Sequence, residues 1–167
     1  MRKAFTLEKP TLQELQAFAR KWARSEAHRA RPTLVFLDGR MGAGKTSFVV
    51  SVAEALGAPD AASPSFALHT RYEGDLGIVD HLDLDRLESM DDLESIGFWD
   101  LIQAAKSEGG KGIGRFVMIE WATRLEEFGA GAYGAPWTSG FQVDSLKFSG
   151  PPDWTVNLLS TSSHEDF

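Results

Sequence analysis

The sequence contains no cysteine among its 167 residues. This absence excludes disulfide bonds and a catalytic thiol, and it agrees with a reducing compartment. The chain also lacks any apolar run near the roughly 18 residues that a membrane-spanning helix needs. Its first residues lack the long apolar core of a secretory signal peptide. We therefore expect a cytoplasmic protein that does not associate with membranes.

Positive charge is scarce as well. The 17 Lys and Arg residues are outnumbered by 24 Asp and Glu residues, which gives a net charge of −7. A nucleic-acid surface needs clustered basic side chains, and RNA-binding grooves add aromatic residues for stacking. The sequence has no such basic, aromatic-studded stretch. We therefore expect no direct binding to nucleic acid.

One complete motif stands out against these absences. Residues 39–46 read Gly-Arg-Met-Gly-Ala-Gly-Lys-Thr, which matches the P-loop pattern G-x-x-x-x-G-K-[ST]. Apolar residues 33–37 before the motif predict a buried strand. Residues 47–56 after it predict a helix that Gly57 ends. A plain glycine-rich turn is the alternative, but the strand–loop–helix context favours a phosphate-binding loop.

The motif predicts a site for nucleotide phosphates and magnesium. Its glycines let several backbone N–H groups converge, and the dipole of the following helix favours an anion. Lys45 is expected to reach the β- and γ-phosphates, and the Thr46 hydroxyl is expected to ligate Mg²⁺. With ATP or ADP as the ligand, the nucleotide-binding residues are expected to be Gly39, Arg40, Met41, Gly42, Ala43, Gly44, Lys45, Thr46, Ser47 and Trp121.

A β-hairpin is predicted over residues 67–84, because two alternating runs flank a glycine-bearing turn. Such a hairpin indicates an antiparallel addition to the sheet. Its second strand would place His81, Asp83 and Asp85 on one face. Three interpretations stay open: Asp83 lies near the nucleotide's magnesium, His81 and the aspartates bind a transition metal, or the face is merely polar with surface charges.

Residues 115–121 predict an apolar strand that ends in an acid. In P-loop enzymes, the strand beside the P-loop strand often ends in an acid that faces the magnesium or the attacking water. Glu120 fits this role as a base or a water-orienting group. Trp121 either covers a nucleotide base or closes the sheet. The predicted catalytic residues are Lys45, Asp83 and Glu120, and the predicted metal ligands are Thr46, Asp83 and Glu120.

The remaining segments predict further elements of one small domain. An edge strand at 3–8 precedes a helix at 12–28, and a capping box at 11–14 starts that helix. Short helices are expected at 89–96 and 98–105, a flexible loop at 106–114, a long loop at 129–140, and a hairpin of strands 141–148 and 154–159 joined by a turn at 149–153. We expect a three-layer α/β P-loop NTPase fold with a mixed central sheet, covering residues 1–160, and a polar tail at 161–167.

Five motifs together resemble the TsaE (YjeE) family of small bacterial P-loop ATPases. They are the loop at 39–46, Ser-Pro-Ser-Phe at 63–66, His-Leu-Asp-Leu-Asp-Arg-Leu at 81–87, Glu-Ser-Ile-Gly at 94–97 and Ile-Glu-Trp at 119–121. The resemblance implies slow Mg²⁺-dependent ATP hydrolysis that supports threonylcarbamoyladenosine modification of tRNA. It also implies a complex with TsaB-like and TsaD-like proteins.

The resemblance also implies roles for individual residues, according to their positions in the family's motifs. Ser65 falls in a switch-like loop, Glu120 falls on a Walker-B-like glutamate, and Trp121 falls beside the nucleotide. Asp83 falls on the acid of the family's His-Phe-Asp-Leu motif. Arg40 and Asp85 depart from the family, which has an acid and a tyrosine there.

Competing functions leave different marks on a sequence. A small-molecule kinase would need a lid bearing arginines, but after Arg124 only Lys147 is basic among the Lys and Arg residues. A GTPase would carry an Asn-Lys-x-Asp base-recognition motif, and none is present. A nucleotide-gated binding module that hydrolyses nothing alone, or a divergent paralogue with another partner, stays open.

Overall fold

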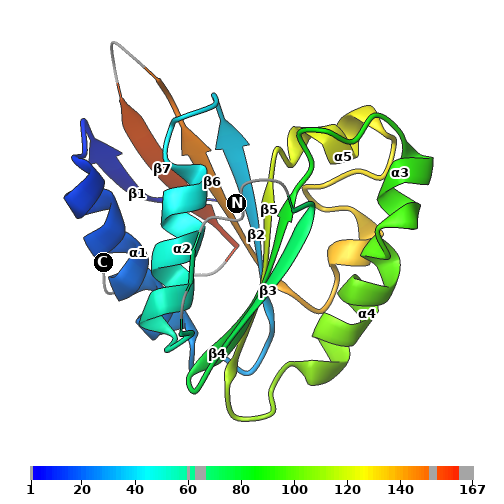
Figure 1. Ribbon diagram of the computed structural model, residues 1–167, viewed down its shortest axis with the longest axis horizontal. Helices are drawn as coiled ribbons and strands as arrows, with labels where there is room; N and C mark the ends of the chain where they lie inside the picture. Colours follow the sequence, from blue (N-terminus) through cyan, green and yellow to red (C-terminus); the bar gives the residue numbers. More distant parts are fainter. Residues whose placement is uncertain (1, 60, 63–66, 151–153, 162–167) are drawn as a thin grey trace.

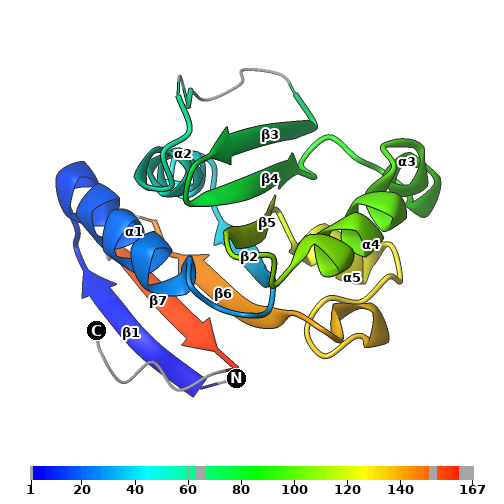
Figure 2. The same ribbon diagram turned by 90° about the horizontal axis from the view of Figure 1, so that it is seen from below.

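The structure, a computed structural model, describes residues 2–59, 61–62, 67–150 and 154–161. These residues form one mixed sheet of seven strands in the order β1-β7-β6-β2-β5-β4-β3, with helices on both faces (Figures 1 and 2). The strands are β1 (Arg2–Glu8), β2 (Thr33–Gly39), β3 (His69–Gly74), β4 (Gly77–Asp83), β5 (Gly114–Glu120), β6 (Gln142–Phe148) and β7 (Thr155–Ser160). The helices are α1 (Leu12–Glu26), α2 (Lys45–Ala55), α3 (Met90–Ser95), α4 (Phe98–Glu108), α5 (Thr123–Glu127) and the 3₁₀ turn η1 (Pro136–Thr138).

The centre of the sheet is parallel and buried on both faces. Strand β2 runs parallel to β5 and β6, and β4 runs parallel to β5. Successive β2 side chains alternate between two cores: Val35 and Leu37 face one, and Leu34 and Phe36 face the other. This alternation explains why the sequence of β2 reads as a continuous apolar run. The antiparallel strands β3, β7 and β1 extend the sheet at its edges.

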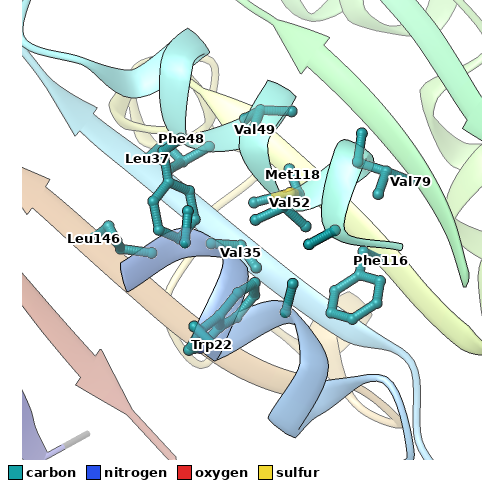
Figure 3. Close-up of a cluster of buried hydrophobic side chains, with 14 of the residues drawn as sticks. Trp22, Val35, Leu37, Phe48, Val49, Val52, Val79, Phe116, Met118 and Leu146 are labelled. Carbon is teal, nitrogen blue, oxygen red and sulfur yellow. The ribbon is translucent and has the colours of Figure 1, made fainter. Parts of the chain in front are cut away.

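Helices α1 and α2 cover one face of the sheet (Figure 2). Trp22 of α1 is completely buried against Phe48 of α2 and Phe116 of β5 (Figure 3). Burial of each such large apolar side chain contributes about 1.5–3 kcal/mol. The capping box predicted at the start of α1 is present, because Thr11 and Glu14 exchange side-chain-to-backbone hydrogen bonds. These contacts fix α1 beside the start of α2.

Helices α3, α4 and α5 cover the opposite face, so the predicted three-layer α/β fold is confirmed (Figure 1). Their second core is built around Phe98 and Ile102 of α4 and the β5 side chains Val117 and Ile119. Ser89 caps α3, with its hydroxyl accepting the N–H of Asp92. In the described part of the chain, no helix is long and apolar enough to span a bilayer.

Most predicted elements are confirmed, with three corrections to their bounds. Helix α1 ends at Glu26 rather than near residue 28, and the loop expected at 106–114 is shorter because α4 continues to Glu108 and β5 begins at Gly114. The long loop at 129–140 contains η1. The turn at 151–153, the tail at 162–167 and Ser65 lie outside the described residues. The domain bounds of 1–160 stay a prediction.

The topology places three strand ends side by side. Because β2, β5 and β4 are parallel neighbours, their carboxyl ends lie at one edge of the sheet. Leu37 pairs with Glu120, and Glu120 pairs with Asp83 across the next ladder. The loop from β2 to α2 therefore begins directly beside the two acids. In open α/β sheets, ligands bind at this edge of the strands.

Candidate functional site

The phosphate loop joins β2 to α2 and is packed tightly. Gly44, the residue before α2, has a φ of 107°, a left-handed conformation that favours glycine. A side chain there would also meet the Leu15 side chain of α1 at 2.7 Å, and one at Gly39 would meet the Phe148 carbonyl oxygen of β6 at 2.5 Å. Gly44 is therefore needed for its backbone conformation and its close approach to α1, and Gly39 for its close approach to β6.

Lys45, the first residue of α2, folds back over its own loop. Its side chain is buried, and Nζ donates to the carbonyl oxygens of Gly39 at 2.6 Å and Arg40 at 2.9 Å. Burial lowers the pKa of the Lys45 ammonium, while the charges of Glu120 and Asp83 oppose that shift. The amine is thus a strong donor, already directed into the concave side of the loop.

Two donors converge on the carboxylate at the end of β5. Thr46 Oγ1 donates to Glu120 Oε1 at 2.7 Å, and His81 Nε2 lies 2.9 Å from the same oxygen. Asp83 lies at the end of β4, in register with Glu120. Burial raises the pKa of the Asp83 carboxyl, and the Glu120 charge raises it further. Thr46, Asp83 and Glu120 thus form a compact set of oxygen donors.

A cavity of about 700 Å³ opens over this cluster, within the size range of small-molecule sites. It brings together most of the residues predicted from sequence. They are Met41, Gly42, Ala43, Gly44, Lys45, Thr46, Ser47, Asp83, Glu120 and Trp121. Gly39 contributes its carbonyl to Lys45 instead of lining the cavity, and the Arg40 side chain lies against Gly150 of the β6–β7 turn. Arg40 therefore does not line this cavity, and its nucleotide contact stays a prediction.

Trp121 lies between the phosphate loop and the second core, and its contact with a nucleotide base stays a prediction. Lys45 Nζ lies 4.5 Å from the centre of its ring, and the ring also packs against the second core. Its backbone is left-handed, with a φ of 57°, and its N–H is bonded to the Leu37 carbonyl. A non-glycine residue in that region stores about 1–3 kcal/mol of strain, and such residues cluster at functional sites.

The far wall of the cavity was not predicted from the sequence. This wall comes from both ends of the chain: Lys9, Pro10, Thr11, Leu12 and Leu15 around the start of α1, and Trp154, Thr155 and Val156 around the start of β7. Lys9 joins the two segments, because its N–H donates to the Trp154 carbonyl at 2.6 Å. Its left-handed φ of 46° marks another strained position. Only the pairing of β1 with β7 reveals that these segments meet.

The acidic segment of the second hairpin strand only partly forms the strand face that its sequence predicts. Strand β4 ends at Asp83, so Asp85 does not continue its strand face. Among the described residues, no three His, Cys, Asp or Glu side chains gather in a way that could hold a metal by themselves. Asp80, on the opposite face of β4, is buried against Arg115. The transition-metal interpretation therefore has no support in the described residues, and His81 instead contacts Glu120.

The fold and the loop together define a P-loop α/β protein. The family model described as "Threonylcarbamoyl adenosine biosynthesis protein TsaE" matches residues 9–138. The chain therefore belongs to the TsaE family, as its motifs predict. The matched region contains the phosphate loop, Asp83 and Glu120, and it stops before β6 and β7.

Three curated relatives carry the name "tRNA threonylcarbamoyladenosine biosynthesis protein TsaE". The protein from Aquifex aeolicus (strain VF5) is 45% identical over 67 residues, which are 38% of this chain and 50% of that protein. The protein from Treponema pallidum (strain Nichols) is 35% identical, over 56% of this chain and 62% of its own length. The protein from Bacillus subtilis (strain 168) is 32% identical, over 63% and 61%. The chain thus spans about half to three fifths of these relatives.

A solved structure agrees with the fold. The crystal structure of YdiB from Bacillus subtilis superposes with a TM-score of 0.58 and covers 97% of this chain and 88% of its own. Only 22% of the aligned residues are identical. At that identity, the likeness confirms the P-loop architecture and does not assign a reaction.

Proposed function

We propose that this protein binds ATP or ADP with Mg²⁺, hydrolyses ATP slowly, and thereby supports threonylcarbamoyladenosine modification of tRNA as a partner of TsaB-like and TsaD-like proteins. The observation that carries the enzymatic part is the meeting of Lys45, Thr46, Asp83 and Glu120 at one cavity. The link to tRNA modification rests on family membership and on the names of the curated relatives.

The donor set suits magnesium. Mg²⁺ prefers hard oxygen ligands and keeps several of its waters, and Thr46, Asp83 and Glu120 offer a hydroxyl and two carboxylates. When bound, the ion would neutralise phosphate charge and polarise the terminal phosphoryl group. In this proposal, the Lys45 ammonium exchanges its two carbonyl acceptors for phosphate oxygens. The Glu120 carboxylate would orient the attacking water, and the Thr46 hydroxyl and the Asp83 carboxylate would help to hold the ion.

The rest of the cavity suits the nucleoside. Leu12, Leu15 and Trp154 supply an apolar wall for the flat base, while Thr11 supplies a hydroxyl at its edge. Trp154 and Leu12 are 37% and 58% exposed, so both present free apolar surface. The loop thus serves the phosphates, and the two terminal segments serve the base.

Calorimetry with Mg²⁺–ATP tests the binding step. Replacing Lys45 with Ala removes a charged donor to the phosphates, which is worth about 1.5–3 kcal/mol, or a 10–150-fold weaker Kd. Lys147→Ala is the matched control, because Lys147 is an exposed lysine of β6 that does not line the cavity. Equal ATP affinity in Lys45→Ala and the parental protein would contradict the proposal.

A further inference from the structure

His81 occupies a place that the predicted catalytic set does not use. It lies on β4, two residues before Asp83, and its side chain is only 5% exposed. Its Nε2 is 2.9 Å from Glu120 Oε1, and the Glu120 side chain is 4% exposed. Residues two apart on a strand share a face, so the register of β4 against β5 brings both His81 and Asp83 to Glu120. The His81 imidazole thus contacts the Glu120 carboxylate without lining the cavity itself.

The chemistry of the pair fixes the direction of the hydrogen bond. An ionised carboxylate can only accept, so the Nε2 atom of His81 carries the proton. The ring is held in place from β3, because Tyr72 stacks on it with centroids 6.4 Å apart and planes tilted by 24°. Tyr72 is anchored in turn by its hydroxyl, which donates to the Ala62 carbonyl at 2.9 Å. His81 is therefore a fixed donor, not a mobile one.

Both donors to Glu120 end on the same oxygen. Thr46 Oγ1 and His81 Nε2 each reach Oε1, and within the described part of the chain no donor contacts Oε2. A carboxylate fixed through one oxygen keeps the other for a water molecule. Among the described residues, only the Thr46 hydroxyl would then hold the Glu120 side chain if His81 were removed, and on the proposed function that hydroxyl would also face the magnesium.

We propose that His81 is a positioning residue for ATP hydrolysis: its Nε2–H holds the Glu120 carboxylate so that Oε2 is presented to the attacking water. The inference rests on the proposed function and adds a residue to it. His81 affects the rate of turnover, whereas nucleotide binding depends on the phosphate loop and the cavity wall. Outer partners that orient a metal-site carboxylate or imidazole are typically worth 10–100-fold in activity.

Two amide substitutions of His81 test whether the position of the donor N–H matters, because both introduce a polar amide but place it at different distances from Glu120. The Nε2 of glutamine can replace the histidine Nε2 as a donor, whereas the shorter asparagine places its amide near the Nδ1 position. We expect His81→Gln to keep kcat within about threefold of the parental value. We expect His81→Asn to lower kcat by 10–100-fold with an unchanged Kd for Mg²⁺–ATP. His69→Asn is the matched control, because His69 makes a similar 2.7 Å contact to Asp80, away from the cavity.

A double-mutant cycle tests whether His81 acts through Glu120. In a Glu120→Gln background, adding His81→Asn should change kcat by less than threefold, because the group that it positions is already lost. Additive losses, equal kcat for His81→Asn and the parental protein, or a His81→Gln as slow as His81→Asn would overturn the positioning role. A parental protein that binds ATP and never turns it over, alone or with its partners, would overturn the proposed hydrolysis itself and His81's role in it.

Discussion

Asp83 carries its charge in surroundings that favour the neutral acid. Burial raises the pKa of its carboxyl, and Glu120 adds a second negative charge nearby. A raised pKa in the folded state means that ionisation opposes folding at neutral pH. As the pH falls through the folded pKa, the carboxyl takes up its proton and this opposition disappears. A residue kept at such a position serves the site and not the stability of the fold.

We therefore expect Asp83→Asn to be more stable than the parental protein at pH 7 and to turn over ATP more slowly. The asparagine oxygen can still accept the Asp85 N–H, which now reaches Asp83 Oδ1 at 3.0 Å. Thermal unfolding without nucleotide, measured at pH 7 and at about pH 3, checks the sign, since the stability difference should vanish below the ordinary pKa of 3.8. A less stable variant at pH 7 would contradict this account.

Individual site residues were predictable where the motif fixes them and not where packing does. Lys45 and Thr46 follow from the loop pattern, because their roles depend on the local backbone. The nucleotide contact of Arg40 stays a prediction, and the position of its side chain against the turn at Gly150 is a packing feature that the motif does not indicate. His81 was predicted only as a candidate metal ligand. Its contact with Glu120 depends on the register between two strands, which the sequence does not reveal.

At the scale of elements, a buried ion pair joins β3, β4, β5 and α4. Asp80 of β4 contacts Arg115 of β5 and His69 of β3, and Arg115 Nε also reaches Glu108 of α4 at 2.7 Å. Both Asp80 and Arg115 are almost fully buried. Burial alone would raise the pKa of Asp80, but the hydrogen bond from His69 and the Arg115 charge outweigh it and lower the pKa.

Arg115→Met should destabilise the protein by about 3–5 kcal/mol, because it leaves the buried Asp80 charge with weaker partners. Adding Asp80→Leu should recover most of that loss, since a well-packed apolar pair replaces the ion pair. Urea unfolding at pH 7 measures both changes. Arg71 Nη1 also lies 3.5 Å from Asp80 Oδ2. Similar stability of Arg115→Met and the parental protein would show that His69 and Arg71 suffice to stabilise the buried Asp80 charge.

The Asp80–Arg115 pair also predicts how the stability of the fold changes at acid pH. A lowered pKa means that Asp80 stabilises the fold above its ordinary pKa of 3.8, and that this contribution is lost as the pH falls through the lower folded value. The double variant has no carboxyl at this position. Its stability should therefore fall less steeply than that of the parental protein below about pH 4.

Elements with local signals were predicted well. The P-loop strand and helix, both hairpins and the capped helices α1 and α3 have their periodicity and turn residues in the sequence itself. The end of α4 was predicted too early. Its last turn is stabilised by the contact of Glu108 with Arg115, a tertiary interaction that local periodicity does not encode.

At the scale of the whole molecule, the net charge of −7 bears on the proposed function, because an acidic protein that supports tRNA modification is expected to do so through other proteins. We expect the isolated protein to show little salt-sensitive affinity for tRNA. Mixed with TsaB-like and TsaD-like proteins of its own organism and ATP, it should form a complex and hydrolyse ATP faster. Size-exclusion chromatography and a phosphate-release assay check these two outcomes, with Lys45→Ala as the control.

Depletion in the cell tests the same role. Threonylcarbamoyladenosine in total tRNA, measured by nucleoside mass spectrometry, should fall when the protein is removed and recover with the parental gene. Unchanged modification after depletion, in a cell without a second family member, would reject the role in tRNA modification. The ATP-binding proposal would survive, because it depends on the loop and the acids and not on the partners.

The fold class followed from the motif and its flanking elements, whereas the strand order did not. Arg2 pairs with Ser160, and Glu8 pairs with Thr155. No local pattern indicates that an edge strand near one end will lie beside the last strand. The cavity wall at Leu12 and Trp154 depends on this long-range pairing, so it became visible only in three dimensions.

The pairing of β1 with β7 also determines when the cavity can form during translation. The phosphate loop is complete once translation has reached Ser47. Its cavity lacks one wall until Thr155 and Val156 have also been synthesised and β7 pairs with β1. Contacts across such a long stretch form slowly, because loop closure must precede them. On the proposed function, ATP cannot act as an early template for folding. Tight nucleotide binding instead requires that β7 has been translated and that the sheet is complete.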